Sequence, residues 1–471
     1  RKERELYGCD PDYPDGYYII SGMNRALLIQ EKLVLNRVLL VEDSQGLTSC
    51  RYLTSVPRGT ALTMISMNNG MMTTRLPSLI RDKDRYTGGE YNDLFNVYYI
   101  YRFLGVHSIE EIRDNIRIFL EGYENPENIL NRAVKNEQDF EVVSEDAMYV
   151  TFQNNTHSSG GVSLEKIKEN INQALRHDLF PNFHFFTIQV GFDENTIRAF
   201  KIRAISYMIS RLLLARCGLI PLDNRDDTGN KRFVSGPSLI GALISNLFRR
   251  SVINLQDRIL SKESNGPTWS SLRESMSLDK ITRDITSSFS TSKWGPKKGL
   301  KAIDNVSQLL QDDGHLAAAA MVHKDNVSAD RTLKNFAVRA IQPSQINLID
   351  PVGVTENTAA GLIKDLSYLT KITPENNISS VMFIIDTYLK NATEMIEGNQ
   401  VQHISDARGP LHNCLMMIEG VLPYAYCLGE KTRDLLLSYR RGTSANGMKL
   451  FTRDVSIWLN GDMLFVDNSP S

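Results

Sequence analysis

Two long apolar helical patterns, separated by a short charged loop, constrain the fold of this chain more than any other feature. Over Thr196–Cys217 the apolar residues recur at helical spacing and form one broad stripe, and Gly218 follows them as a C-terminal cap. A second pattern, rich in Leu, Ile and Arg, covers Ser238–Ser261. A helix with such a wide apolar face has to be buried against other elements. We therefore expect a helical core, with the polar loop Leu222–Ser235 exposed at its edge, where loops carry function.

Strand patterns on both sides of these helices predict a multidomain α+β chain. Gly16–Glu31 places β-branched and aromatic residues around a break at Ser21–Gly22, which indicates a β-hairpin. Other expected elements are strands within Leu53–Leu76, Val381–Tyr388, Cys414–Tyr424 and Ser456–Val466, and helices at Tyr91–Gly105, Ser108–Tyr123, Ser163–His177 and from Gly361 to Ile372. The polar stretches Lys262–Lys301 and Asp312–Gln345 are interpreted as exposed loops. A chain of 471 residues is too long for one ordinary core.

The composition limits the class of function. Lys and Arg number 53 and Asp and Glu number 55, so a nucleic-acid role has to rest on local patches rather than on a global basic excess. The five cysteines include no C-x-x-C pair, which argues against a disulfide framework and a structural zinc and favours a reducing compartment. No apolar run reaches the roughly 18 residues of a membrane-spanning helix, and the start of the sequence is charged, so no membrane partner is expected.

Sequence templates for stand-alone catalysis do not occur. The phosphate-cradling G-x-x-x-x-G-K-[ST], the dinucleotide-binding G-x-G-x-x-G after a strand, the zinc-binding H-E-x-x-H and the metal-binding D-x-D-G-D are all missing. The eight histidines are dispersed, with no pair at metal-ligand spacing. We therefore expect neither catalytic residues nor metal ligands on this chain.

The charged loop is the first candidate contact. Asp223–Arg232 packs acidic and basic residues around one glycine. One interpretation is a solvated turn whose charges pair with one another. The other is that Lys231 and Arg232 point outward to phosphate or to a partner subunit, while the carboxylates hold the backbone. On the second interpretation the residues that contact DNA or a subunit are Arg225, Asp226, Lys231 and Arg232.

Two later segments are also candidate contacts. Ser290–Lys298 joins Trp294 to several lysines, among them Lys293. The tryptophan is either a base-stacking platform or, more commonly, an anchor of the core. Asp330–Arg339 spaces three cations around one apolar spine, as a basic patch or as a solvated loop. These cations are Arg331, Lys334 and Arg339.

The identity and order of these segments resemble the second-largest, or β-type, subunit of multisubunit DNA-dependent RNA polymerases. GYYIISGMNRALLIQE at Gly16–Glu31 resembles the family's G-Y-F-I-I-N-G-x-E-K-V-L-I-x-Q-E, NRDDTGNKR at Asn224–Arg232 resembles D-R-D-H-x-G-N-K-R, and ITRDITSSFSTSKWG at Ile281–Gly295 resembles I-T-x-G-L-x-x-x-L-A-T-G-N-W-G. VRAIQPSQ at Val338–Gln345 stands where the family has P-R-x-L-H-P-T-H, VTENTAAGLIKDLS at Val354–Ser367 where it has T-P-E-G-x-x-x-G-L-V-K-N-L-S, and Trp458–Gly461 resembles F-V-N-G. These segments keep the family's order, so the chain is identified as the N-terminal half of such a subunit.

The resemblance implies a domain plan. Residues 1–55 and 216–295 correspond to the two parts of the protrusion, with its start truncated, and residues 56–215 correspond to the lobe. Residues 296–370 correspond to the fork, and residues 371–471 to an external domain with its end truncated. In the family the fork lies at the downstream edge of the active centre, where the DNA strands part. The residues that this places at the nucleic acid or at the edge of the active centre are Arg331, Lys334, Arg339, Gln342 and Glu356.

The resemblance also implies cofactors and partners. The chain is expected to act as a subunit of a DNA-directed RNA polymerase, a nucleotidyltransferase whose Mg²⁺ is held by carboxylates of the largest (β'-type) subunit. The other expected partners are the C-terminal half of the β-type subunit, template DNA, the RNA transcript and NTPs. No zinc is expected on this chain, because the family's zinc site lies C-terminal to the segments matched here.

Departures from the family pattern suggest the lineage. The family's E-T-P-E-G has become Gly353–Asn357, which keeps one acid as Glu356, and the P-T-H stretch has lost its histidine. Such drift resembles the polymerases of large DNA viruses and giant phages. The expected location is therefore intracellular, in the host cytoplasm or nucleus, or in the virion if the source is viral. The alternative is a non-catalytic paralogue that serves as a structural or regulatory binding module for nucleic acid or protein.

Overall fold

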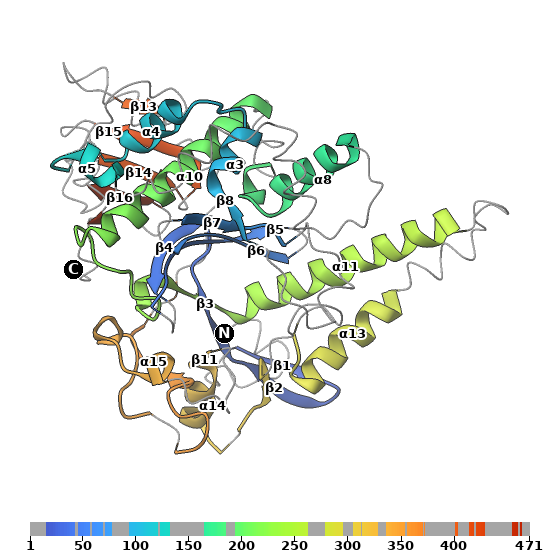
Figure 1. Cartoon of the computed structure of the whole chain (residues 1–471). Coiled ribbons are helices and arrows are strands. Elements are labelled where there is room, and N and C mark those ends of the chain that lie inside the picture. The colour runs from blue at the N-terminus through green and yellow to red at the C-terminus, as the bar shows by residue number, and fades with distance from the viewer. Residues whose placement is uncertain are drawn as a thin grey trace. The chain divides into compact units, whose positions relative to one another are not determined.

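The chain divides into two compact units, each of which is described by itself. The computed structural model (Figure 1) describes residues 16–42, 46–56, 59–68, 71–77, 94–120, 123–131, 164–184, 194–261, 278–294, 305–311, 313–327, 336–353, 356–370, 372, 401–403, 414–418, 421–428, 455–459 and 462–463. Unit 1 comprises Arg1–Val34 and Arg225–Pro374, and unit 2 comprises Leu35–Asn224 and Glu375–Ser471. Both units combine helices and sheets, which confirms the mixed α and β character of the chain.

Unit 2 contains a five-stranded antiparallel sheet whose strands follow one another in chain order. The strands are β4 (Arg37–Glu42), β5 (Thr48–Val56), β6 (Gly59–Asn68), β7 (Met71–Arg75) and β8 (Leu94–Asn96). The helices are α3 (Val97–Phe103), α4 (Ile109–Arg117), α5 (Pro126–Asn131), α8 (Leu164–His177) and α10 (Glu194–Arg216). β4 and β5 belong to the same sheet as β6, so the expected limit between residues 55 and 56 lies within one sheet, and the two units divide earlier in the chain.

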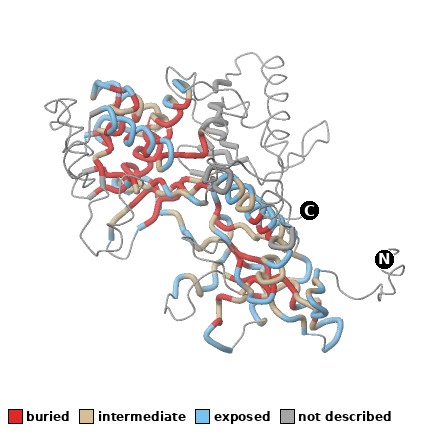
Figure 2. The backbone as a smooth tube through the Cα atoms, turned by 90° about the vertical axis from the view of Figure 1, so that its right-hand side faces the viewer, coloured by how far each residue is buried: buried red, intermediate tan, exposed pale blue. Residues whose placement is uncertain are grey.

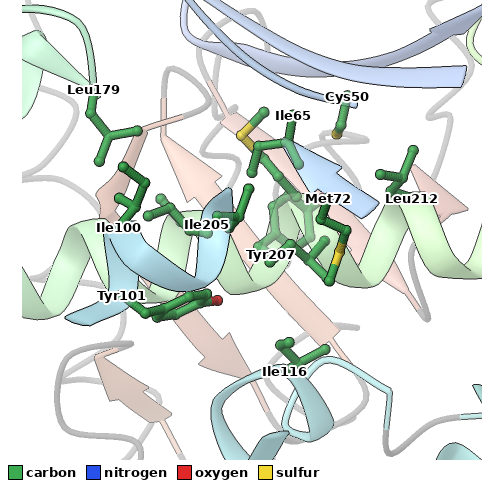
Figure 3. Packing of buried hydrophobic residues seen from close by; sticks show 14 of the residues in the cluster. Cys50, Ile65, Met72, Ile100, Tyr101, Ile116, Leu179, Ile205, Tyr207 and Leu212 are labelled. Carbon is green, nitrogen blue, oxygen red and sulfur yellow. The ribbon is translucent and has the colours of Figure 1, made fainter. Parts of the chain in front are cut away.

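The central helix of unit 2 is α10, the first of the two apolar patterns. It packs against β5, β6 and α4, and its buried positions continue around the helix instead of forming one stripe. Figure 3 shows part of this core, which includes Ile65, Met72, Ile100, Ile205 and Tyr207. The hydroxyl groups of Tyr101 and Ser206 lie 2.7 Å apart and hydrogen bond inside it. The expected core helix is therefore confirmed.

Two buried cations of unit 2 are held by hydrogen bonds and an ion pair. Nζ of Lys201 donates to the carbonyl oxygen of Leu175 at 2.6 Å and lies 3.0 Å from Nε2 of His184. Burial lowers the pKa of Lys201 to about 7 and, together with the nearby Lys201, the pKa of His184 to about 4. Nη2 of Arg211 lies 3.3 Å from Oδ2 of Asp223, so the first acid of the charged loop is anchored in this unit.

The last strands of the chain form a second five-stranded sheet, in the order β13-β15-β14-β16-β17. They are β13 (Val401–His403), β14 (Cys414–Ile418), β15 (Val421–Leu428), β16 (Val455–Leu459) and β17 (Asp462–Met463). The strands expected within Cys414–Tyr424 and Ser456–Val466 are confirmed, and the one expected at Val381–Tyr388 lies outside the described residues.

The hairpin expected at Gly16–Glu31 opens unit 1. β1 (Tyr17–Ile20) and β2 (Met23–Leu27) pair in antiparallel fashion, and β10 (Ser307–Leu309) extends the sheet beside β2. At the turn, φ is 52° at Ser21 and 78° at Gly22. Positive φ at both central residues matches the twist of a two-stranded hairpin, as in a type I′ turn. The predicted second strand is divided after β2, because β3 (Ile29–Leu33) joins a different sheet.

That second sheet of unit 1 has four strands, in the order β12-β11-β3-β9. β9 (Lys231–Val234) runs antiparallel to β3, β11 (Lys324–Val327) runs parallel to β3, and β12 (Ile363–Asp365) runs antiparallel to β11. Register partners share a face of a sheet, and successive residues alternate between faces. The register therefore places four charged residues on one face: Glu31, Lys231, Asp325 and Lys364.

Two helices of unit 1 pack on its smaller apolar core. α11 (Gly236–Ser261) and α13 (Leu278–Thr291) lie side by side in Figure 1 and pack against each other. The remaining helical elements are α14 (His315–Val322), α15 (Phe336–Arg339) and the 3-10 turns η2 (Thr228–Asn230) and η3 (Pro343–Gln345). The core residues are Leu27, Leu239, Leu243, Leu247, Phe289, Trp294 and Val306. Figure 2 shows how the buried segments alternate with exposed ones along the described backbone.

Several expectations of local structure were wrong. Lys262–Lys301 was expected to be a loop but contains α13, which buries Phe289 and packs Ile281 and Ile285 on the same side despite its many Ser and Thr residues. Asp312–Gln345 contains α14, β11 and α15. The helix expected from Gly361 is instead the short strand β12, which pairing with β11 stabilises. The charged loop ends in η2 and β9, because its last residues pair with β3.

Candidate nucleic-acid interface

Segments that lie far apart in the sequence meet in the four-stranded sheet of unit 1. The hairpin motif (Gly16–Glu31) supplies most of β3, and the loop motif (Asn224–Arg232) supplies the start of β9. The lysine motif (Val354–Ser367) supplies β12. Three of the segments that carry the resemblance to polymerases therefore share one hydrogen-bonded sheet.

Glu31 is the centre of the charged face of this sheet. Its Oε2 lies 3.1 Å from Nζ of Lys364, and its Oε1 contacts Nζ of Lys231. All three side chains are less than one tenth exposed. A buried carboxylate between two ammonium groups is favourable only because each charge has a partner. The end of the hairpin motif is thus fastened to both the loop motif and the lysine motif.

The two lysines decide the protonation of Glu31. Burial alone raises the pKa of this carboxyl, but the opposing effects of Lys364 and Lys231, with the hydrogen bonds of the cluster, outweigh burial and hold the pKa below its ordinary value. Glu31 is therefore ionised throughout the neutral range. Its charge is available to both lysines at once.

The structure corrects the expected direction of Lys231. This side chain was expected to point outward, but it is buried and pairs with Glu31 and, at 3.4 Å, with Oδ1 of Asp226. The reason is the strand register, which turns Lys231 toward the charged face of the sheet. The charged loop thus holds one ion pair within itself, as the self-paired interpretation supposes, and a second one with β3.

The loop motif also contacts the arginine motif (Val338–Gln345). The amide of Thr228 donates to Oγ of Ser344 at 3.0 Å, and the hydroxyl of Ser344 donates to Oγ1 of Thr228 at 3.1 Å. η2 and η3 are thereby joined across 116 positions of sequence. The turn of η3 is itself closed by a capping box between Gln342 and Gln345.

Arg339 fastens the arginine motif to the lysine motif. Its Nη1 donates to the carbonyl oxygens of Thr358 at 2.9 Å and Ala360 at 2.6 Å. Gly361, with φ of +74°, lies so close that a Cβ at this position would be 2.8 Å from the carbonyl oxygen of Arg339. Only glycine accepts both this φ and this approach. The guanidinium is half-buried, and in this structure it positions the segment that follows Glu356.

The remaining candidate residues differ in exposure. Arg225, Lys293 and Glu356 are exposed, and Asp226, Arg232 and Gln342 are partly exposed. Nη1 of Arg232 donates to the carbonyl oxygens of Lys231 at 3.0 Å and Gly229 at 3.3 Å, so its side chain folds over its own loop. Arg331 and Lys334 lie outside the described residues. Whether any of these side chains touches nucleic acid or a subunit stays a prediction.

Trp294 occupies the interior of unit 1. Its indole Nε1 donates to the carbonyl oxygen of Leu239 at 3.0 Å, and its ring packs edge-on against Phe289 with centroids 4.9 Å apart. The side chain is 4% exposed, so the structure matches the interpretation as a core anchor, and the ring presents no face on which a base could stack. The neighbouring Lys293 is exposed.

Sequence reasoning did not find the charged cluster of the sheet. Glu31 and Lys364 lie within recognised motifs, but neither was singled out, and Asp325 lies in a stretch that was interpreted as a loop. β3, β11 and β12 each carry further polar or charged residues, so their local sequence does not mark these side chains as buried. The partners come from strands up to 333 residues apart, which no local pattern reveals.

Metal and membrane features can be stated for the described residues alone. Among them, no group of three or more His, Cys, Asp or Glu side chains is arranged to hold a metal ion. Glu31, at the centre of the charged face, contacts two lysines. No helix in the described ranges has the length and apolar character required to cross a membrane.

Comparison with known proteins gives two family matches and a set of relatives. The family described as RNA polymerase Rpb2, domain 2, matches residues 90–233, and RNA polymerase Rpb2, domain 3, matches residues 316–372. The DNA-directed RNA polymerase III subunit RPC2 of Drosophila melanogaster is 24% identical over 414 residues, which cover 85% of this chain and 33% of that protein. The RNA polymerase II subunit RPB2 of Encephalitozoon cuniculi is 23% identical over 392 residues, with 82% and 32% covered.

An archaeal relative is covered more fully. The DNA-directed RNA polymerase subunit Rpo2N of Methanococcus vannielii is 24% identical over 387 residues, which cover 80% of this chain and 70% of that protein. The chain spans about a third of the length of the eukaryotic relatives that it matches. These matches support a β-type, N-terminal subunit, in agreement with the order of the sequence motifs.

Proposed function

We propose that this chain is the N-terminal part of the β-type subunit of a DNA-directed RNA polymerase, and that it positions nucleic acid at the edge of the active centre. One observation carries the proposal. The hairpin, loop, arginine and lysine motifs, spread over residues 16–367, are joined by ion pairs and hydrogen bonds into one part of unit 1. Motifs that matched by chance would have no reason to converge in this way.

In this proposal the domain plan follows the family. Residues 1–55 and 216–295 form the protrusion, residues 56–215 the lobe, residues 296–370 the fork, and residues 371–471 an external domain. The loop motif and the fork-like segment meet at Thr228 and Ser344. The match of residues 316–372 to RNA polymerase Rpb2, domain 3, covers most of the proposed fork.

The proposed role of this chain is positioning. Exposed cations such as Arg225 and Lys293 neutralise phosphates of the template, the non-template strand or the transcript, and each contact adds a salt-dependent term that is independent of sequence. Arg339 acts one step further back, because it holds the segment after Glu356 in place. Nucleotidyl transfer needs metal ions that clamp the attacking and leaving oxygens. We assign the carboxylates that hold Mg²⁺ to the largest subunit.

The proposed partners are those of a multisubunit polymerase. They comprise the largest (β'-type) subunit, a polypeptide with the C-terminal half of the β-type subunit, DNA, RNA and NTPs. A viral lineage, with activity in the host cell or the virion, is part of the proposal on the ground of the drift at Gly353–Asn357 alone.

Reconstitution tests this function. The chain is purified alone and together with its partner subunits, and both preparations are assayed for Mg²⁺-dependent extension of an RNA primer on a DNA template. We expect extension from the complex and none from the isolated chain. Extension by the chain alone would refute the assignment of the catalytic carboxylates. A complex that binds nucleic acid but never extends the primer would favour the non-catalytic paralogue.

A further inference from the structure

Asp325 of β11 lies on the charged face of the four-stranded sheet without a positive partner of its own. It is 0% exposed, and neither carboxyl oxygen accepts a hydrogen bond from any described residue. Both lysines of this face are already engaged by Glu31. A buried ionised carboxylate without a donor is costly, so its charge has to be removed or compensated.

The charges around Asp325 can be counted strand by strand. On the same face lie its register partner Lys364 of β12, Glu31 of β3 and, one strand further, Lys231 of β9, while the loop adds Asp226 beside Lys231. Lys324 and Asp365 are register partners on the opposite face, where Nζ of Lys324 lies 3.9 Å from Oδ1 of Asp365. When Asp226 of the loop is counted with the four residues of the charged face, the three acids outnumber the two lysines by one if every group is ionised. One retained proton makes this group of five residues neutral.

Burial decides which acid keeps that proton. Glu31 contacts both lysines, and Asp226 is partly exposed and pairs with Lys231. Asp325 has neither advantage. Burial, followed by the negative charge of Glu31, raises the pKa of Asp325 well above its ordinary value. A protonated Asp325 can donate its O–H to a carboxylate oxygen of Glu31, which is the strong, charge-assisted kind of hydrogen bond.

We propose that Asp325 is a positioning residue that keeps a proton inside this sheet and, by donating it to Glu31, holds Glu31 in place for the two lysines that fasten the loop motif and the lysine motif. Asp325 touches no nucleic acid in this scheme. Its effect on transcription passes through Glu31, Lys231 and the loop Arg225–Arg232, and that part of the inference rests on the proposed function.

Two substitutions separate the proton from the side chain. Asp325→Asn keeps the shape and provides an N–H donor in place of the O–H, so it imitates the protonated acid at every pH. Asp325→Ala removes the donor. In the purified complex, hydrogen–deuterium exchange of the peptides that cover residues 225–234 should be unchanged by Asn. With Ala it should rise roughly tenfold, as the loss of one buried hydrogen bond implies.

The pH profile gives a readout that a purely structural role does not move. Between about pH 6 and pH 9 the Asn variant should show at least the loop protection and the elongation rate of wild type. Any advantage of the Asn variant should lie at the alkaline end, where wild-type Asp325 is closest to losing its proton. An Asn variant that exchanges as fast as the Ala variant would show that the ionised carboxylate is what matters, and an Ala variant identical to wild type would show that Asp325 positions nothing. Either result overturns the proposal.

Infrared spectroscopy of the complex with ¹³C-labelled aspartate tests the proton itself and covers the case in which the Ala variant does not assemble. Wild type should show the carbonyl band of a protonated acid that Asp325→Asn lacks. Absence of that band would overturn the proposal. It would also be overturned if an added cation slowed amide exchange in wild type but not in the Asn variant, because a cation would then compensate the charge of Asp325 in place of a proton. Neither the amide-exchange measurement nor the infrared measurement depends on RNA synthesis. A wild-type complex without polymerase activity would therefore contradict the proposed function, whereas the exchange and infrared results would still decide whether Asp325 is protonated.

Discussion

The Nζ atom of Lys364 lies 3.1 Å from Oε2 of Glu31, a residue 333 positions earlier in the chain. Glu31 also contacts Lys231. One carboxylate therefore joins the end of the hairpin motif to the start of β9 and to β12. The consequence is that Lys231, which the sequence alone suggests as a surface contact, forms an ion pair inside the protein.

Glu31→Gln should strongly destabilise unit 1. The amide cannot balance two buried ammonium groups, and breaking a buried ion pair on one side costs about 3–5 kcal/mol. Urea unfolding followed by circular dichroism measures the loss. Asp313→Asn is the matched control, because it removes one carboxylate from an exposed position of the same unit and should change stability by less than about 0.5 kcal/mol. Equal stability of the two variants would contradict the role assigned to Glu31.

Acid should unfold the wild type partly through Glu31. Its folded-state pKa lies below the ordinary value of 4.5, so the folded state binds fewer protons than the unfolded state in the window between the two values. The stabilisation is present above pH 4.5 and is lost as the pH falls through the folded-state pKa. Thermal unfolding from pH 7 downward should show a stability advantage of wild type over Glu31→Gln that shrinks below pH 4.5. A constant advantage would contradict this.

Substitution of two cations of the loop motif should affect different properties, one the stability of unit 1 and the other the binding of nucleic acid. Lys231→Met leaves Glu31 with one lysine and should lower the stability of unit 1 by at most about 3–5 kcal/mol. Arg225→Ala removes an exposed charge and should leave stability unchanged, while it lowers the salt slope of nucleic-acid binding by about one unit. Unfolding curves and binding measured over a salt series check both. A salt slope unaffected by Arg225→Ala would favour the interpretation of the loop as a self-paired surface turn.

Arg339→Ala should loosen the lysine motif. The variant loses the hydrogen bonds to Thr358 and Ala360, so amide exchange should increase over residues 356–363, and elongation should slow while the subunits still assemble. Arg339→Lys should retain part of the protection, because an ammonium group can still donate to these carbonyl oxygens but lacks the reach and planarity of guanidinium. Peptides of unit 2 serve as the internal control. Unchanged exchange in the Ala variant would rule out this positioning role.

The lowered pKa of Lys201 should make the stability of unit 2 rise with pH. Its folded-state pKa is about 7 against an ordinary value of 10.5, so between these values the unfolded state binds more protons and stability rises with pH. Relative to Lys201→Met, wild type should gain up to about 1.4 kcal/mol per pH unit across that window. Lys166→Met, at an exposed position of α8, is the control and should show no such trend. Parallel pH profiles of wild type and Lys201→Met would contradict the assignment.

Features with strong local patterns could be predicted from the sequence. The periodicity of Thr196–Cys217 gave α10 to within two residues at either end, because a wide apolar face specifies burial regardless of partners. The hairpin turn at Ser21–Gly22 was found for a similar reason, since a short break between two apolar runs suits positive φ. Both depend on residues that are close in the chain.

Features that depend on distant pairing could not be predicted. β12 has three residues, and pairing with β11 makes it a strand. Lys231 turned inward because its register opposite Leu33 places it on the face of Glu31, and the loop sequence does not encode that register. α13 was missed because Ser and Thr dominate its surface, although Ile281, Ile285 and Phe289 mark its buried side. In each case the deciding partner is far away in the sequence.

In the proposed function, unit 1 of this chain presents the loop motif to nucleic acid in a working polymerase. The most direct measurement is photocrosslinking from a photoreactive amino acid at position 225 in a complex that is extending a labelled transcript, with position 313 as the control. We expect crosslinks to DNA or RNA from position 225 that disappear at high salt, and none from position 313. An active complex in which positions 225, 293 and 356 all fail to reach nucleic acid would contradict it.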